Sequence, residues 1–237
     1  MGAVTTPAVT PQAVTQAVDT RLPELWPQVW EALGQTLTMV SITLVLGGAL
    51  GMLLGLALQL TKRGGLYANA PAYVLLNTLV NFFRPIPFVI FIAAVQPAAR
   101  LVVGIGIGTR AVVFALTLAA MFMIARIVEQ NLVSVSPGVI EAARAMGASR
   151  LRVTFTVLVP EALGPLVLGF TFAFVAIVDA SAIAGVIAGG GLGTFAQQYG
   201  YRQFDWVVTW TAVLLLVAIV QLAQLAGNLL ARKVLRT

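Results

Sequence analysis

The chain has 237 residues, of which 59% are hydrophobic and only 9% are charged, whereas soluble domains carry about 25% charged residues. This composition excludes an ordinary water-soluble fold and indicates that lipid forms part of the solvent. The net charge of +6 comes from basic residues that stand mostly singly between apolar segments, so they indicate membrane topology and lipid-headgroup contacts rather than a nucleic-acid surface.

The first 29 residues are expected to form a flexible tail ahead of a transmembrane domain that covers residues 30–237. The stretch up to Thr20 is rich in Thr, Ala, Pro and Gln. It has no Lys or Arg before Arg21 and no apolar core, so it lacks the pattern of a cleavable signal peptide.

Five apolar segments follow, each with the roughly 20 residues that a helix needs to cross a bilayer. They cover about residues 33–60, 73–99, 111–132, 163–188 and 206–230. Their apolar runs do not alternate, which excludes a transmembrane barrel. The predicted fold is therefore an all-α bundle of five transmembrane helices. In the first span, Gly47, Gly51 and Gly55 predict a ridge where a second helix packs closely.

The second span is interrupted at Arg84-Pro85-Ile86-Pro87. Proline lacks an N–H and disfavours helical geometry in the residue before it, so this motif predicts a broken helix. Broken helices occur in membranes where they line a cavity or are buried in protein. The break therefore either shapes the wall of a translocation path or is a structural kink in which neighbouring carbonyls satisfy Arg84.

The third span ends near Arg126 and Glu129, which are three residues apart on one helix face. We expect them to form an internal ion pair that supports the loop at residues 133–162. That loop contains Ser136-Pro137, an N-cap residue followed by proline at the first helical position, which predicts a helix start.

The helix that starts at Pro137 is predicted to be short and amphipathic. Val139, Ala143 and Met146 form one apolar stripe at helical spacing, and Gly147 supplies a C-terminal stop. Small residues allow a partner surface to approach closely, which favours a docking element. The alternative is an amphipathic helix that lies on the lipid interface.

A second helix is expected after this glycine turn. Ser149 can cap its start, and it runs to Leu158 and ends at Pro160. The segment between the third and fourth spans is therefore predicted to be two ordered helices rather than a disordered connection.

Asp179 lies inside the fourth span, close to Ser181. An ionisable residue within a span is costly and indicates a functional role by default. Two interpretations remain open. Asp179, with Ser181 beside it, faces the translocation path and attracts an amino group, or it pairs with Arg84 or Arg126 or stays protonated.

The glycine run at residues 189–193 ends the fourth span. Gly191 and Gly193 either form part of a gate to the translocation path or simply stop the helix. The sequence does not choose between these two interpretations.

The positive-inside rule favours an outside amino terminus and a cytoplasmic carboxyl terminus. In that orientation, the inside segments carry Lys62, Arg63, Arg144, Arg150, Arg152, Arg232, Lys233 and Arg236. The outside segments carry Arg21, Arg100, Arg110 and Arg202. The loop at residues 133–162 is then cytoplasmic.

This loop resembles the "EAA" loop of the permease subunits of bacterial ATP-binding-cassette (ABC) importers, written E-A-A-x3-G-x9-I-x-L-P. Glu141, Ala142, Ala143, Gly147 and Pro160 match that pattern. Val157 and Val159 replace its Ile and Leu. The resemblance implies that the helix with Glu141, Ala142, Ala143 and Arg144 is a coupling helix, which sits in a groove of a separate ATPase subunit.

Further motifs resemble the methionine-importer permease subfamily over about residues 30–232. They are RPIPF at 84–88, IARIVEQNL at 124–132, GGGLG at 189–193 and QQYGY at 197–201. The resemblance implies a homodimer of permeases, two ATPase subunits and an extracytoplasmic methionine-binding protein at a bacterial inner membrane. Asp179 departs from the subfamily, which usually has a small residue there.

No catalysis is expected on this chain. It has no cysteine or histidine, and no metal site or cofactor is predicted. A phosphate-binding P-loop needs Gly-Lys-Ser/Thr, but Lys62 follows Thr61 and Lys233 follows Arg232. ATP and Mg²⁺ would then belong to the partner ATPase. The prediction is a methionine permease that works by alternating access. The alternatives are an EAA-type permease for another small solute or an ion-coupled secondary transporter.

Overall fold

The computed structural model describes residues 20–235, and helices make up almost all of this range. The main helices are α2 (Trp26–Thr61), α3 (Ala70–Phe83), α4 (Phe88–Ala94), α5 (Gln96–Val103), α6 (Thr109–Val133), α7 (Pro137–Ala145), α10 (Leu163–Ala188) and α12 (Trp206–Leu235). Shorter turns are η1 (Leu22–Leu25), α8 (Arg150–Val153), η2 (Thr154–Leu158), α9 (Val159–Glu161), α11 (Gly191–Phe195), η3 (Ala196–Gly200) and η4 (Tyr201–Gln203). The prediction of an all-helical bundle is confirmed.

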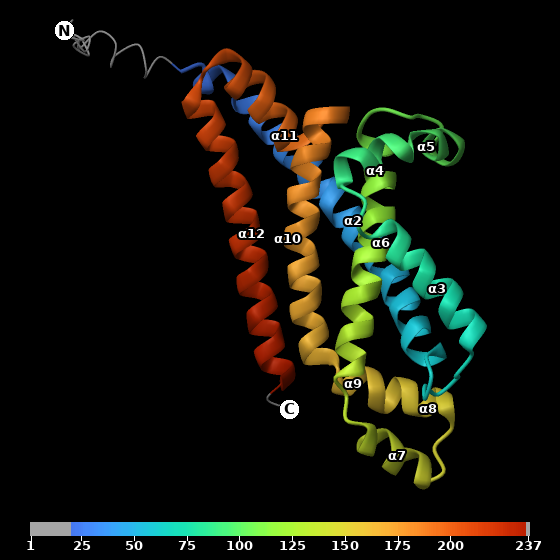
Figure 1. Cartoon of the computed structure of the whole chain (residues 1–237). Coiled ribbons are helices and arrows are strands. Elements are labelled where there is room, and N and C mark those ends of the chain that lie inside the picture. The colour runs from blue at the N-terminus through green and yellow to red at the C-terminus, as the bar shows by residue number, and fades with distance from the viewer. Residues whose placement is uncertain (1–19, 236–237) are drawn as a thin grey trace, which may run out of the picture.

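Within residues 20–235, four helices (α2, α6, α10 and α12) are long and apolar enough to cross a membrane. The predicted second span is different, because α3 and α4 are bent by 108° at the Arg84–Pro87 break. Only if this bent pair counts as one span does the number of crossings reach five. Figure 1 shows α3 running alongside the bundle and α4 turning away from its axis.

The predicted tail extends less far than residue 29. Leu22–Leu25 form η1, and α2 begins at Trp26, so residues 22–29 are helical. Leu25 and Val29 are buried in a cluster with residues of α11 and α12, which is why this segment is ordered. With 36 residues, α2 is about 54 Å long, more than a bilayer core is thick. Residues 1–19 of the predicted tail lie outside the described residues.

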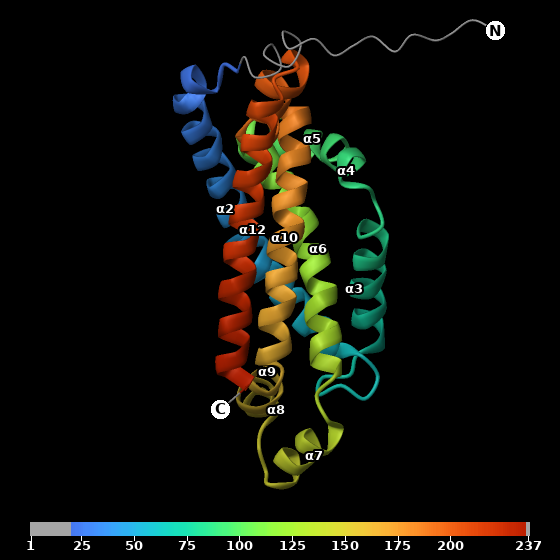
Figure 2. The same cartoon turned by 90° about the vertical axis from the view of Figure 1, so that its left-hand side faces the viewer.

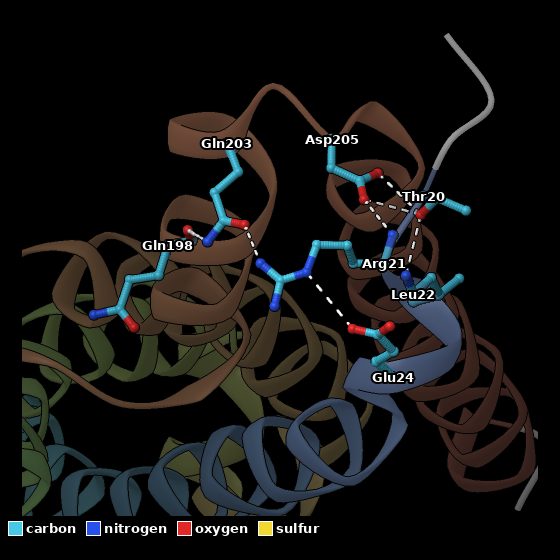
Figure 3. Close-up of polar contacts among 7 residues, drawn as sticks. All are labelled: Thr20, Arg21, Leu22, Glu24, Gln198, Gln203 and Asp205. Atoms are coloured by element: carbon cyan, nitrogen blue, oxygen red, sulfur yellow. Dashed lines mark hydrogen bonds and ion pairs between the residues drawn. The ribbon is translucent and has the colours of Figure 1, made fainter. Parts of the chain in front are cut away.

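The start of this segment is tied to the start of α12 by Asp205 (Figure 3). Its carboxylate accepts hydrogen bonds from the Thr20 hydroxyl (2.9 Å) and the Arg21 N–H (2.9 Å). It also caps α12 by accepting from the Val208 N–H (3.1 Å). Partial burial raises the pKa of Asp205, but these hydrogen bonds outweigh it and hold the pKa below its usual value of 3.8.

The glycine ridge of α2 packs against α6, as predicted. A Cβ atom at Gly51 would lie 2.7 Å from the Ile124 Cβ, and one at Gly55 would lie 2.5 Å from the Ala125 carbonyl oxygen. Both distances are shorter than atomic contact permits, so only glycine lets the two backbones approach this closely. The α2–α6 pair is the closely packed centre around which α3 and α10 are arranged.

The loop between α6 and α10 forms a separate layer at one end of the bundle. Figures 1 and 2 show α7 beyond the end of the bundle and α8–α9 lying across it. The prediction that Pro160 ends the second helix is wrong, because the helical path continues through α9 to Ala162. The π-helical turn η2 widens the helix just before Pro160, where a regular helix would need the N–H that proline lacks.

Candidate functional site

The short helix α7 presents most of its surface to solvent. Ala143 is buried, but Val139 and Met146 are 42% and 82% exposed. Of the predicted apolar stripe, only Ala143 is buried among the described residues. Glu141, Ala142 and Arg144 are exposed as well. An exposed helix with small and apolar side chains is suited to docking on another surface.

The end of α7 is fixed by Gly147, which has a φ of +82°. The Gly147 N–H donates to the Arg144 carbonyl (3.0 Å), and the Ala148 N–H donates to the Ala143 carbonyl (3.2 Å). This pair of bonds is a Schellman motif, which favours glycine at the left-handed position. The helix stop predicted from Gly147 is confirmed.

The two serines predicted to cap the helices of this loop behave differently. Ser149 caps α8 through its hydroxyl, which accepts from the Arg152 N–H (3.3 Å). Ser136 stands at the N-cap position of α7 but makes no capping hydrogen bond with its side chain. Glu141 and Arg144 line a cavity of about 210 Å³ between α7 and the loop that follows α2.

The break between α3 and α4 borders a second cavity. Arg84 follows the last residue of α3, and its side chain lines a space of about 350 Å³ between α3, α4, α6 and α10. Within residues 20–235, its guanidinium has no hydrogen-bond acceptor and no ion-pair partner. The predicted kink is present, but the neighbouring carbonyls do not accept hydrogen bonds from Arg84 as expected. Pro85 and Pro87 are exposed beside it.

Asp179 is exposed on α10, and no described residue forms an ion pair with it. The interpretation that it pairs with Arg84 or Arg126 is therefore wrong for this protomer. Ser181 is buried, and its hydroxyl donates to the Val178 carbonyl in the same helix (2.7 Å). The structure thus separates the two residues: Asp179 is available to an outside group, and Ser181 is not.

The predicted ion pair between Arg126 and Glu129 is confirmed. Sequence reasoning missed two further partners on α3. Arg126 also donates to the side-chain oxygens of Asn77 (3.0 Å) and Asn81 (2.5 Å). The signal that could have found them is the spacing of two asparagines four residues apart in an apolar segment. This network ties α3 to α6.

Gly191 and Gly193 are buried in the turn and helix that follow α10. The N–H of Gly191 donates to the Gln35 side chain (2.7 Å), and that of Leu192 donates to the Thr36 hydroxyl (2.8 Å). Two polar residues of α2 thus cap α11, a contact that was not predicted. Whether either glycine acts as a gate stays a prediction.

Several known proteins are similar to this chain. Over 177 residues it is 40% identical to the probable D-methionine transport system permease protein MetI of Vibrio cholerae, covering 75% of this chain and 79% of that protein. Over 173 residues it is 38% identical to the methionine import system permease protein MetP of Bacillus subtilis, covering 73% of this chain and 78% of that protein.

Comparison of the fold with solved structures finds a similar protein. A structure of the MetNI methionine ABC transporter in an inward-facing conformation matches with a TM-score of 0.85 and 39% identity, covering 90% of this chain and 98% of that chain. Residues 47–236 match the family described as the inner membrane component of binding-protein-dependent transport systems. The chain therefore belongs to the family of binding-protein-dependent transport system inner membrane components.

Proposed function

We propose that this chain is the permease subunit of an ABC importer and moves methionine, or a related amino acid, inward by alternating access. The observation that carries the proposal is α7, an exposed helix held beyond the bundle and closed by Gly147. Ala143 is buried and Ile140 packs on the core, and the other faces of the helix are left to a partner. The relatives named as methionine permeases supply the substrate class.

In this proposal, α7 is the coupling helix, and a partner ATPase binds its exposed surface. Val139, Ala142 and Met146 supply apolar contact, while Glu141 and Arg144 supply charge. Pro160 lies in the layer beneath, which transmits the movement of α7 to α10. ATP and Mg²⁺ bind to the ATPase, which hydrolyses the ATP. This chain forms the translocation path and catalyses no reaction.

We propose four kinds of partner: a second copy of this chain, two ATPase subunits, an extracytoplasmic binding protein and membrane lipid. The second copy would cover the face of α10 that carries Asp179. Arg84, Pro85, Pro87 and Asp179 then border the translocation path. A charged face left open inside a membrane needs protein or water against it, which is the physical reason for the second copy.

We place the amino terminus outside and the α7 end in the cytoplasm of a bacterial inner membrane. The two ends of the bundle carry the basic residues unequally. Lys62, Arg63, Arg144, Arg150, Arg152, Arg232 and Lys233 belong to the segments at the α7 end. Arg21, Arg100, Arg110 and Arg202 belong to the opposite end. The excess at the α7 end favours that end as cytoplasmic.

Reconstitution tests the proposal. The chain is placed in proteoliposomes with its ATPase and binding protein, and uptake of labelled methionine is measured with and without ATP. Gly147→Val forces a β-branched residue to a positive φ and is expected to abolish coupling. Gly138→Ala, on the same helix and with ample space, serves as the matched control.

ATP-dependent uptake that Gly147→Val abolishes and Gly138→Ala preserves supports both the coupling role and the substrate. ATP hydrolysis without methionine uptake points to an EAA-type permease for another solute. Uptake that is indifferent to ATP contradicts the class and favours an ion-coupled transporter.

A further inference from the structure

We propose that each protomer has its own amino-acid site in the membrane, formed by the cavity at the α3–α4 break. The cavity takes the substrate's apolar side chain, Arg84 takes its carboxylate and Asp179 takes its ammonium group. This inference rests on the proposed function and deepens it, because it places the recognition of the substrate within one protomer.

The cavity has the size and lining that such a side chain needs. Its volume of about 350 Å³ lies at the lower end of the range for small-molecule sites, roughly 300–1,000 Å³. Its walls include Phe83, Phe88, Phe91, Phe122, Met123 and Phe172. A thioether makes favourable contacts with aromatic rings, so a methionine side chain suits these walls.

The aromatic wall is organised before any ligand arrives. Phe83 stacks on Phe122 with ring centroids 4.8 Å apart, and it meets Phe91 edge-on at 6.3 Å. These contacts join α3, α4 and α6, so the bend at Arg84 is what brings the rings together. A preformed wall reduces the ordering that binding would otherwise require.

One charged side chain lines this cavity and a second lies at its border, and neither has a partner among residues 20–235. Arg84 lines the cavity, and a guanidinium binds a carboxylate through two parallel hydrogen bonds. Ala176 and Phe172 on α10 line it as well. Asp179 is not one of the lining residues, but it is three residues beyond Ala176 and seven beyond Phe172, so it lies beside them on α10. A zwitterionic amino acid offers a complementary group to each charge.

A second cavity in the same protomer provides the contrast. It lies between α2, α10 and α12, has a volume of about 450 Å³ and is lined by residues such as Phe170, Ala223 and Ala226. In the part of the chain that the structure describes, no ionisable side chain lines it. This cavity is larger, but it has no charged residue in its lining. It can therefore hold an acyl chain but cannot bind the charged groups of an amino acid.

Single cysteines test the proposal, because the natural chain has none. Ala176→Cys and Ala119→Cys place a thiol on two helices that line the proposed site, α10 and α6, and Ala226→Cys places one in the other cavity. Each variant is reconstituted with the ATPase and binding protein and treated with a small, polar methanethiosulfonate reagent. Labelling of the permease chain is measured with and without saturating methionine.

A methionine that fills the pocket would block access of the reagent to both thiols, so we expect it to slow labelling at Ala176→Cys and Ala119→Cys by about fivefold or more. Labelling at Ala226→Cys should not respond to methionine. Absence of labelling at both wall positions, or labelling that methionine does not slow, overturns the site. If the wild-type complex still imports methionine, the proposed function stands. If it does not, the proposed function and the site fall together.

Discussion

Two pairs of charged residues in the membrane-spanning region differ in whether other residues of the chain satisfy their charges. Arg126 and Glu129 are paired with each other, and two asparagines complete the hydrogen bonds of the arginine. Arg84 and Asp179 have no such partners among residues 20–235. A satisfied charge holds helices together, whereas an unsatisfied charge is free to bind an incoming group. A hydropathy profile does not distinguish these four residues, because the difference lies in their hydrogen-bond and ion-pair partners.

The paired position also explains why α3 stays in place. This helix follows a loop, ends at a break and packs mainly against α6 and the end of α2. The Arg126 network joins its two asparagines to α6 and so fixes the helix that leads into Arg84. The structural charges thus position the functional ones.

The largest expected effect is on stability at the paired position. Glu129→Leu leaves the guanidinium of Arg126 largely buried without its carboxylate, which costs about 3–5 kcal/mol in the free energy of unfolding. Denaturant unfolding in detergent measures this loss. The double variant Arg126→Met with Glu129→Leu should recover most of it. A single-variant loss no greater than that of Asp179→Asn would remove the distinction between the two positions.

A smaller loss is expected where α2 meets α6. Gly55→Ala puts a Cβ atom 2.5 Å from the Ala125 carbonyl oxygen and should cost about 1–3 kcal/mol through overpacking. Gly34→Ala is the matched control on the same helix, since no atom lies within 4 Å of its added Cβ. The same unfolding assay compares them. Equal stability of the two variants would contradict the close packing of these helices.

The smallest effect is expected at Asp205. Asp205→Ala removes the cap of α12 and should cost about 1 kcal/mol at neutral pH. Because the folded-state pKa is lowered, the stabilisation is complete above the unfolded value and is lost as pH falls through the folded one. The difference from wild type should therefore shrink as the pH falls below about 5.

Glu24→Ala is the control for this comparison. Its 3.7 Å ion pair with Arg21 is largely exposed, so its removal should change stability little. A difference between wild type and Asp205→Ala that grows as the solution is acidified would show that the carboxylate is not stabilised in the folded state.

Local signals in the sequence predicted much of this structure. The long apolar helices follow from hydropathy, because lipid leaves the backbone no other way to satisfy its hydrogen bonds. The start of α7 at Pro137 and its end at Gly147 follow from residues whose conformational limits are local. The ridge at Gly51 and Gly55 was visible for the same reason.

Features that depend on distant residues could not be predicted. Proline at 85 and 87 signals a break but not its angle of 108° or the cavity beside it. The capping of α11 by Gln35 joins residues 156 positions apart. The sequence does not reveal that a π-helical turn accommodates Pro160. Nor does it reveal that residues 22–29 are ordered, because their packing on α11 and α12 leaves no periodic signal.

The most direct test of the central comparison is methionine uptake per folded complex, measured in proteoliposomes for Asp179→Asn and Glu129→Leu. Hydrogen bonds to charged groups are worth about 1.5–3 kcal/mol, so Asp179→Asn should lower uptake per folded complex about tenfold or more. Glu129→Leu should lower the amount of folded complex far more than the uptake of what remains folded. The reverse pattern, with Asp179→Asn transporting normally and Glu129→Leu folding normally but failing to transport, would contradict the assignment of the two charged positions.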